Sequence, residues 1–279
     1  MQLGTIHHGG TTRAVRVDRD TGEVVLLDAV DVGQLLADGG SPSGNEPVDG
    51  SVEETIDLSD VQWAPVVTRP NKIICVGLNY RDHVEEMGRE LPPAPTYFSK
   101  FSGALIGAND ELRLPNPAIS THNDWEAELA MIIGRPARNV DVTDALDHVA
   151  GFTAFNDFSV RDYQRRTSQF LAGKTFEQAS GLGPFMVTVD EIGDGSGLAI
   201  SSSVNGEVKQ RSNTDQLIFG TAELVADLSQ IITLEPGDVI ATGTPGGVGA
   251  ARTPPEWLRL GDELVISIEG IGELRHRCV

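Results

Sequence analysis

The fold is decided by the stretch Asp124-Trp125-Glu126-Ala127-Glu128-Leu129-Ala130-Met131-Ile132-Ile133-Gly134. Its apolar second half predicts a β-strand inside a sheet. Side chains two residues apart share one face of a strand, so Glu126 and Glu128 project together. Two adjacent carboxylates repel each other unless a cation or a proton lies between them. The alternative is the exposed polar face of an edge strand, and the apolar run after Glu128 argues against it.

A third acid follows in Phe152-Thr153-Ala154-Phe155-Asn156-Asp157-Phe158-Ser159, where Asp157 ends an aromatic strand. A buried acid in such surroundings needs a partner. Three carboxylates without a nearby His or Cys suit a hard cation such as Mg²⁺ or Mn²⁺. They would leave about three of six octahedral positions for water and substrate. Glu126, Glu128 and Asp157 therefore form a candidate catalytic metal site.

The rest of the chain reads as short strands separated by Gly, Pro and Asp turns, with few helices. A hairpin is expected over residues 14–27, and a polar loop over 38–47. Further strands are expected at 72–77, 126–133, 185–189, 198–204, 238–242 and 263–268, and helices at 143–148 and 221–232. The fold class is thus mostly β (α+β). We expect a small β-rich N-terminal domain over residues 1–68 and a catalytic domain over 69–279.

Composition excludes several classes of protein. The formal net charge of −20 disfavours nucleic acid and anionic membranes as partners. No apolar run approaches the ~18 residues of a membrane helix. The first residues carry no secretory signal pattern, so a cytoplasmic location is expected. The two cysteines, Cys75 and Cys278, have neither zinc-site nor disulfide spacing, and Cys75 is expected in the core.

The same motifs resemble those of the fumarylacetoacetate hydrolase family. That family carries D-W-E-x-E-L, N-D and R-D-x-Q, which match residues 124–129, 156–157 and 161–164. Its V-G-x-N-Y-x-x-H-x-x-E matches residues 76–86, and further matches run through 173–176, 182–184, 205–207, 234–249 and 268–272. The resemblance covers residues 70–279 in the family's order. Each motif is weak alone, and together they are specific.

The resemblance implies a mixed β-sandwich roll for the catalytic domain, usually in a homodimer. It also implies that Glu126, Glu128 and Asp157 bind Mg²⁺ or Mn²⁺, with Ca²⁺ a possible non-native substitute. The branch it suggests holds the acylpyruvases and the 2-hydroxyhepta-2,4-diene-1,7-dioate isomerases. One departure is Phe176-Glu177, where the family more often has F-D.

Catalytic roles follow from the resemblance for three further residues. His83 and Glu86 would form a dyad on a mobile lid over residues 81–95; without the family, a solvated helix pair would be the preferred interpretation. Lys174 would stabilise a developing enolate, rather than lie at the surface. Substrate contacts are expected from Arg161, Gln164, Gly243 and Thr244, although the glycine-rich loop at 242–247 has a plain turn as its alternative.

The expected reaction is hydrolysis of an acylpyruvate such as fumarylpyruvate to pyruvate and a carboxylic acid. His83 would activate water, and the metal and Lys174 would stabilise the pyruvate enolate. The family also holds decarboxylases of oxaloacetate-type acids and isomerases of 2-hydroxy-dienedioates from aromatic catabolism, and the shared motifs do not separate these activities. A non-catalytic Ca²⁺-binding protein is the rival from another class, which the dyad and Lys174 disfavour.

Overall fold

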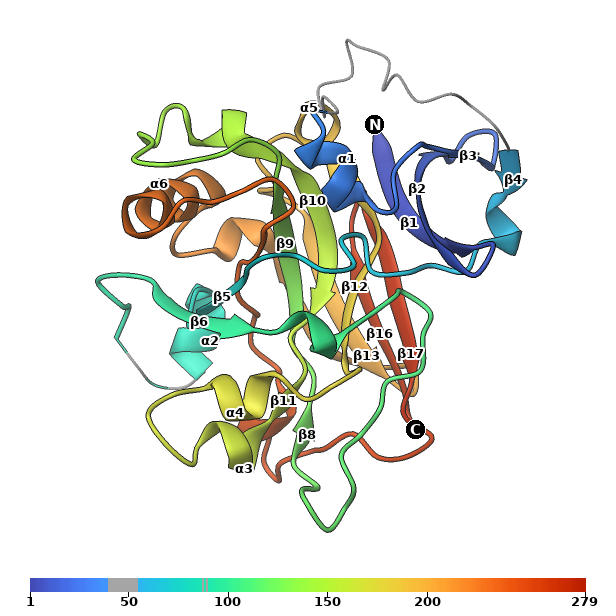
Figure 1. Cartoon of the computed structure of the whole chain (residues 1–279). Coiled ribbons are helices and arrows are strands. Elements are labelled where there is room, and N and C mark those ends of the chain that lie inside the picture. The colour runs from blue at the N-terminus through green and yellow to red at the C-terminus, as the bar shows by residue number, and fades with distance from the viewer. Residues whose placement is uncertain (40–54, 87, 89) are drawn as a thin grey trace.

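The protein is described here from a computed structural model, which covers residues 1–39, 55–86, 88 and 90–279. Strands dominate and helices are few and peripheral, as the sequence predicts (Figure 1). The expected loop at 38–47 falls mostly outside the described residues. The expected strand at 263–268 is confirmed to the residue, and the others are confirmed within a few positions, except one discussed below.

Eleven strands form one continuous sheet in the order β4-β3-β2-β1-β12-β10-β9-β15-β5-β6, with β7 paired to β12 at the side. Their bounds are β1 Gln2–His8, β2 Thr11–Asp18, β3 Glu23–Leu26, β4 Thr55–Asp57, β5 Ile73–Gly77, β6 Thr96–Lys100, β7 Leu105–Ile106, β9 Ala127–Ile133, β10 Val149–Asn156, β12 Ser180–Thr188 and β15 Val239–Ala241. The expected hairpin is present as β2 and β3, which pair antiparallel.

Strand β1 joins the N-terminal hairpin to the rest of the sheet. It pairs antiparallel with β12, with Leu3 opposite Met186. Leu3 and Met186 are buried in one apolar cluster with Ile132 of β9. The two-domain division stays a prediction, but any such boundary would be bridged by backbone hydrogen bonds and by shared core.

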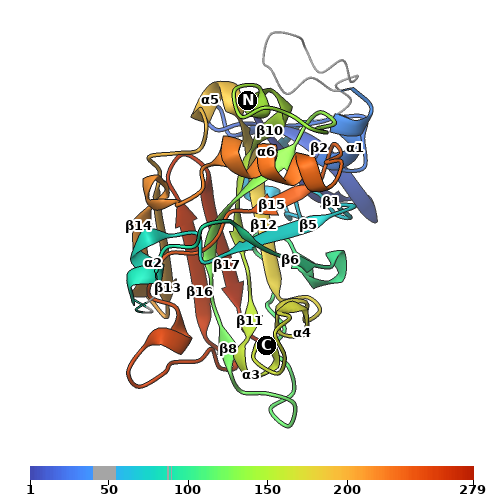
Figure 2. The ribbon, with the colours of Figure 1, turned by 90° about the vertical axis from the view of Figure 1, so that its left-hand side faces the viewer.

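A second sheet of four strands packs against the long strands of the first, which Figure 2 shows from the side. Its order is β14-β13-β16-β17, with bounds β13 Ala199–Val204, β14 Glu207–Asn213, β16 Glu263–Ile268 and β17 Gly272–Arg277. A two-stranded sheet pairs β8 Asn123–Asp124 with β11 Ser159–Val160. The main core lies between the layers, so the central strands β9 and β10 are buried on both faces.

Helices are short apart from α6. Their bounds are α1 Val32–Ala37, α2 Arg81–Glu86, α3 Arg161–Gln164, α4 Leu171–Lys174, α5 Val189–Ile192 and α6 Thr221–Ile231, with 3₁₀ turns η1 Leu58–Asp60, η2 Ser102–Ala104, η3 Ala145–His148, η4 Thr214–Gln216 and η5 Gly249–Ala251. The helix expected at 221–232 is therefore confirmed as α6. The helix expected at 143–148 is only the 3₁₀ turn η3, whose N-cap residue Asp144 makes no side-chain capping bond.

Strand β12 starts five residues before the strand expected at 185–189. Gly181, Gly183 and Pro184 indicated a turn in the sequence, yet they lie within the strand. Gly181 is required there, because a Cβ at this position would lie 2.2 Å from Nε2 of His276. Residues that read locally as turn formers thus serve close packing between strands.

Candidate metal centre and active site

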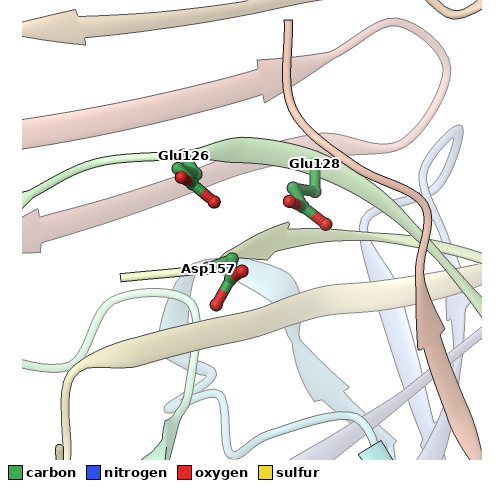
Figure 3. Close-up of side chains that lie close together, drawn as sticks. All are labelled: Glu126, Glu128 and Asp157. Atoms are coloured by element: carbon green, nitrogen blue, oxygen red, sulfur yellow. The ribbon is translucent and has the colours of Figure 1, made fainter. Parts of the chain in front are cut away.

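The carboxylates of Glu126, Glu128 and Asp157 converge at one end of β9 and β10. The antiparallel register places Asn156 opposite Ala127, so Asp157 faces Glu126, and its N–H donates to the Glu126 carbonyl at 3.0 Å. One oxygen from each of the three acids lies within 4.8 Å of the other two, and all three residues are buried (Figure 3). The shared face expected from period-two spacing is confirmed.

Three buried cations surround these acids. The Lys174 Nζ donates to Glu126 at 2.6 Å and to Asp157 at 2.7 Å. Lys100, at the end of β6, lies 2.9 Å from the other Asp157 oxygen. Arg161, the first residue of α3, contacts the second Glu126 oxygen at 2.7 Å. Glu128 has no such cation, and within the described chain its carboxylate accepts one hydrogen bond, from the Gly243 N–H at 3.0 Å.

This asymmetry separates the pKa values of the two glutamates. Burial opposes ionisation of Glu126, but Lys174 and Arg161 outweigh burial and lower its pKa to about 2. Burial, Asp157 and Glu126 all raise the pKa of Glu128 well above its ordinary range. A carboxyl whose ionisation is opposed in this way is a group whose ionised form a bound cation would stabilise.

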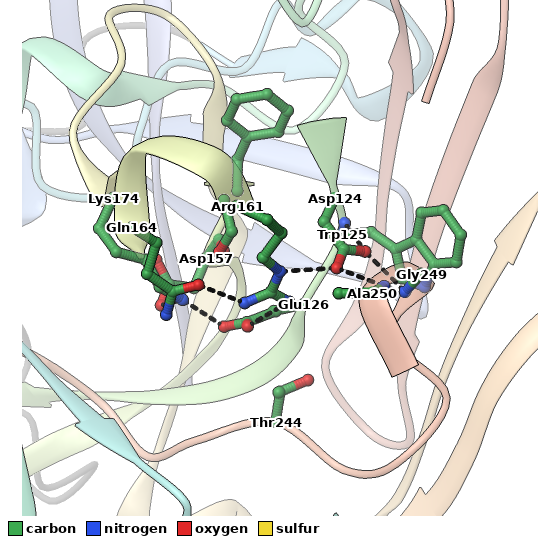
Figure 4. A network of polar contacts seen from close by, with 12 residues as sticks. Asp124, Trp125, Glu126, Asp157, Arg161, Gln164, Lys174, Thr244, Gly249 and Ala250 are labelled. Atoms are coloured by element: carbon green, nitrogen blue, oxygen red, sulfur yellow. Dashed lines mark hydrogen bonds and ion pairs between the residues drawn. The ribbon is translucent and has the colours of Figure 1, made fainter. Parts of the chain in front are cut away.

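Arg161 also connects the metal centre to a network of hydrogen bonds around Asp124 (Figure 4). Its Nε donates to Asp124 at 2.7 Å, and its Nη1 donates to the Gln164 side chain at 3.0 Å. Asp124 also accepts backbone N–H groups from Trp125, Gly249 and Ala250 at 2.9, 2.7 and 3.0 Å. Asp124 therefore orients Arg161 and anchors η5, and so supports the site without belonging to the three clustered acids.

Fully ionised, the centre does not balance its own charge. The acids Asp124, Glu126, Glu128 and Asp157 outnumber the cations Lys100, Arg161 and Lys174 by one. A divalent cation among the three clustered carboxylates would turn this excess into one positive charge. The donor set is all oxygen, which fits a hard divalent cation, and the resulting centre would attract an anionic substrate.

A cavity of about 610 Å³ opens onto this centre. Glu126, Glu128 and Lys174 line its buried end, together with Arg161 and Gln164. Phe98 and Phe170 form an aromatic wall, with ring centroids 5.6 Å apart, and Lys174 lies 5.0 Å from the Phe98 ring centroid. A concave site with a few converging charges is the usual form of a small-molecule site.

His83 and Glu86 on α2 line the same cavity. The His83 Nδ1 lies 3.3 Å from a Glu86 carboxylate oxygen, so Nε2 is the ring nitrogen left for a ligand. Glu86 also accepts the Gly247 N–H at 3.2 Å, and Asp82 accepts the Ser212 hydroxyl at 2.6 Å. The structure thus brings the expected dyad to the cavity, on a helix held down by two carboxylates. The expected lid over 81–95 stays a prediction, and residues 87 and 89 lie outside the description.

The loop after β15 supports the centre from the other side. Gly243 has φ +106°, and a Cβ there would come 2.9 Å from that of Asn79, so this position requires glycine. Its N–H is used by Glu128, and the Thr244 hydroxyl donates to the Ala127 carbonyl at 2.9 Å while it accepts from Gln210 at 2.8 Å. These contacts brace β9. Substrate binding by Gly243 and Thr244 stays a prediction.

Several cavity residues carried no signal in the sequence. Arg165, Phe98 and Phe170 line the cavity but lie in segments of the sequence without a motif. The Asp82 contact with Ser212 joins α2 to β14 across 130 residues. Only knowledge of the fold could have brought these residues together, because sequence spacing does not report long-range contacts.

The part of the chain that forms the metal centre and the His83–Glu86 dyad also matches known proteins. The family description "Fumarylacetoacetate (FAA) hydrolase C-terminal" matches residues 72–279. The chain belongs to the fumarylacetoacetate hydrolase family. It is 47% identical over 223 residues to the bovine and human proteins named oxaloacetate tautomerase FAHD2A, mitochondrial, covering 79% of this chain and 70% of each relative. The family match begins at residue 72, one residue before β5, inside the predicted catalytic domain.

Solved structures of this family cover the chain throughout. A fumarylacetoacetate hydrolase from Exiguobacterium antarcticum superposes with a TM-score of 0.88 at 30% identity, over 100% of this chain and 99% of that one. A 2-hydroxyhepta-2,4-diene-1,7-dioate isomerase from Mycobacterium marinum gives 0.79 at 30% identity, over 100% and 98%. The expected fumarylacetoacetate hydrolase fold is thereby confirmed, and the chain is an enzyme-family member with a buried acidic triad that could bind a divalent metal.

Location is less closely defined. No helix in the described part of the chain is long and apolar enough to cross a membrane. The FAHD2A relatives are named as mitochondrial, so the cytoplasmic location expected from the sequence stays a prediction.

Proposed function

We propose that this protein is a divalent-metal-dependent isomerase that interconverts the keto and enol forms of a small 2-oxo acid of the oxaloacetate type. The observation that carries the proposal is that one cavity holds both the His83–Glu86 dyad and the three clustered carboxylates. With a divalent cation bound to these carboxylates, the buried centre would carry an excess positive charge. The 47% identity to proteins named oxaloacetate tautomerase supports it. Acylpyruvate hydrolysis, the reaction first expected, has weaker support.

Tautomerisation needs one group that takes a proton from carbon and returns it to oxygen, or the reverse. His83 can do this through Nε2, while Glu86 holds the ring and stabilises its protonated form. Lys174 and Arg161 place fixed positive charge where negative charge develops on the substrate oxygen. No attacking water is required.

The metal would be held by Glu126, Glu128 and Asp157, and it would supply Lewis-acid polarisation of the 2-oxo group. The all-oxygen donor set favours Mg²⁺ or Mn²⁺. The side chains around it already have partners, because Lys100, Lys174 and Arg161 fix four of the carboxylate oxygens at this centre. The protein thus supplies a preorganised set of carboxylate oxygens for the cation.

A second candidate is hydrolysis of a carbon–carbon bond. The similarity to the fumarylacetoacetate hydrolase from Exiguobacterium antarcticum favours it. It would use the same dyad to activate water, and the same centre to hold the enolate that leaves. Decarboxylation of oxaloacetate is a further possibility of the same site.

The test follows the two products separately. Enolic oxaloacetate absorbs in the ultraviolet, so its decay with Mg²⁺ or Mn²⁺ measures tautomerisation, and coupling to lactate dehydrogenase measures pyruvate release. We expect metal-dependent decay of the enol that is faster than pyruvate formation. Pyruvate release from acylpyruvates at a higher kcat/KM than oxaloacetate tautomerisation would contradict the proposal and establish the hydrolase.

A further inference from the structure

Arg165 is a charged cavity residue whose guanidinium has no ion-pair partner among the described residues. It follows α3 directly, it is exposed to solvent, and it lines the cavity that ends at the metal centre. In the described part of the chain no carboxylate lies within ion-pair distance of its side chain, and its backbone N–H donates to the Arg161 carbonyl at 3.1 Å. An unpaired guanidinium at the mouth of a binding cavity is available to a ligand.

Arg161 and Arg165 are four residues apart, and the hydrogen bond between them continues the helical spacing. Residues four apart lie on one face of a helix, with Cβ atoms about 5–6 Å apart. Arg161 faces inward to Glu126, whereas Arg165 lies outward at the solvent end. The two guanidinium groups therefore mark the inner and outer ends of one path into the cavity.

A dicarboxylic 2-oxo acid would present charges at both ends of such a path. Its 2-oxo carboxylate would bind at the inner end, by the metal centre, and its second carboxylate would point toward the mouth. Guanidinium groups bind carboxylates through two parallel hydrogen bonds. A local cation at the mouth would also offset the repulsion that a chain of net charge −20 exerts on a dianion.

We propose that Arg165 binds the distal carboxylate and makes this enzyme selective for dicarboxylic over monocarboxylic 2-oxo acids. This rests on the proposed function for the identity of the reacting end. It assigns Arg165 to substrate selection, apart from the metal centre and the His83–Glu86 dyad. Arg165 can serve this role because its guanidinium pairs with no carboxylate among the residues that the structure describes.

The chain offers a matched control in the next residue. Arg166 has the same charge, and it lies over the Tyr163 ring at 3.2 Å from the centroid, outside the set of cavity-lining residues. Arg165→Ala and Arg166→Ala therefore change the net charge of the chain equally. Only the first removes a guanidinium from the cavity.

Binding is measured by calorimetry on the Mg²⁺-loaded full chain with two ligands that cannot enolise. N-oxalylglycine carries a 2-oxo acid group and a distal carboxylate, and oxamate carries only the first. We expect Arg165→Ala to weaken N-oxalylglycine on the order of tenfold and to leave oxamate unchanged, as expected for loss of one charge-assisted contact. Arg166→Ala should change neither affinity.

Turnover gives a second readout with oxaloacetate and its 4-ethyl ester. Wild type should prefer oxaloacetate, and Arg165→Ala should lose that preference through a higher KM for oxaloacetate, while Arg165→Lys keeps part of it. Equal weakening of both ligands in each pair, or no change in either pair, would overturn the proposal. Failure of the wild type to act on either substrate would instead refute the proposed function, since the calorimetric ratio does not depend on turnover.

Discussion

Glu128 is the least compensated of the three clustered acids, because Lys174, Lys100 and Arg161 form ion pairs with Glu126 and Asp157 but not with Glu128. The pKa of Glu128 is raised in the folded protein. The contribution that its protonated form makes to the stability of the metal-free protein is therefore fully present below the ordinary pKa of 4.5. This stability is lost as the pH rises through the raised value in the folded protein. Metal binding requires the ionised form and must release a proton.

We therefore expect the thermal stabilisation by Mg²⁺ to grow with pH. Melting curves with and without excess Mg²⁺ at several pH values from 5 to 8.5 measure the increment. The contribution of Glu128 to the stability of the metal-free protein should fall as the pH rises through the raised pKa of this group, and the increment should widen as it does so. A constant increment would contradict the assignment of Glu128 as the proton-releasing ligand.

Glu128→Gln should abolish metal binding and raise the melting temperature of the metal-free protein at pH 8. The amide keeps an oxygen for the Gly243 N–H and removes the carboxylate that burial opposes. A gain on the order of 1 kcal/mol corresponds to about 2–4 °C. Glu126→Gln is the contrasting variant, because it leaves Lys174 and Arg161 without their partner, and it should lower the melting temperature.

His83→Ala should lower the rate of enol decay by about 10²–10⁴, the usual value of general acid–base catalysis. Oxalate binding in the presence of Mg²⁺ should survive, because His83 contacts Glu86 and none of the three clustered carboxylates in the described contacts. Stopped-flow absorbance and calorimetry separate the two effects. A variant that tautomerises oxaloacetate at close to the wild-type rate would remove His83 from the mechanism.

At the scale of single elements, α2 is positioned by its acids. Asp82 accepts the Ser212 hydroxyl of β14, and Glu86 accepts the Gly247 N–H. Val84 is buried beneath the helix, at 1% exposure. A six-residue helix has little stability of its own, so these contacts hold it over the cavity.

Asp82→Asn should weaken this attachment and speed hydrogen exchange over residues 81–86. Activity should fall mainly through kcat, because the dyad would be in place for less of the time. Glu85→Gln is the control, since Glu85 is exposed and its side chain makes no hydrogen bond or ion pair with the described residues. Unchanged exchange in Asp82→Asn would show that packing of Val84 alone positions the helix.

The sequence predicts some of these elements better than others, for physical reasons. The triad followed from strand periodicity and burial, which are local properties, and Glu126, Glu128 and Asp157 do meet. The strand at 180–184 was missed because Gly181 and Pro184 serve tertiary packing, which local propensity does not report. The engagement of Gly243 and Thr244 with β9 was missed for the same reason: their partners lie more than 100 residues away.

At the scale of the whole molecule, the first four strands extend the sheet that carries the metal centre. β1 covers the edge of β12 with backbone pairing and buries Leu3 against Met186 and Ile132. Removing residues 1–68 would leave β12 with an open edge and an exposed apolar surface.

We expect a chain of residues 69–279 to aggregate, or to melt well below the full chain, even with saturating Mg²⁺. Circular dichroism melting and size-exclusion chromatography of the two chains test this. The latter also tests the expected homodimer for the full chain. A truncated chain that melts at the same temperature would establish residues 69–279 as an independently folding domain, as the sequence analysis proposed.

The cavity joins two kinds of wall. Its inner wall is made of central strands that also form the core, so Glu126 and Glu128 cannot move without disturbing the packing around β9. Its outer wall, where Arg165, Thr167 and Phe170 line the cavity, belongs to the turn between α3 and α4. Substitutions at Arg165 and Thr167 have few packing consequences, because both residues are exposed. In evolutionary terms, substrate choice can drift by changes in one surface turn while the chemistry is inherited intact, and a directed-evolution library aimed at new substrates should begin at Arg165 and Thr167.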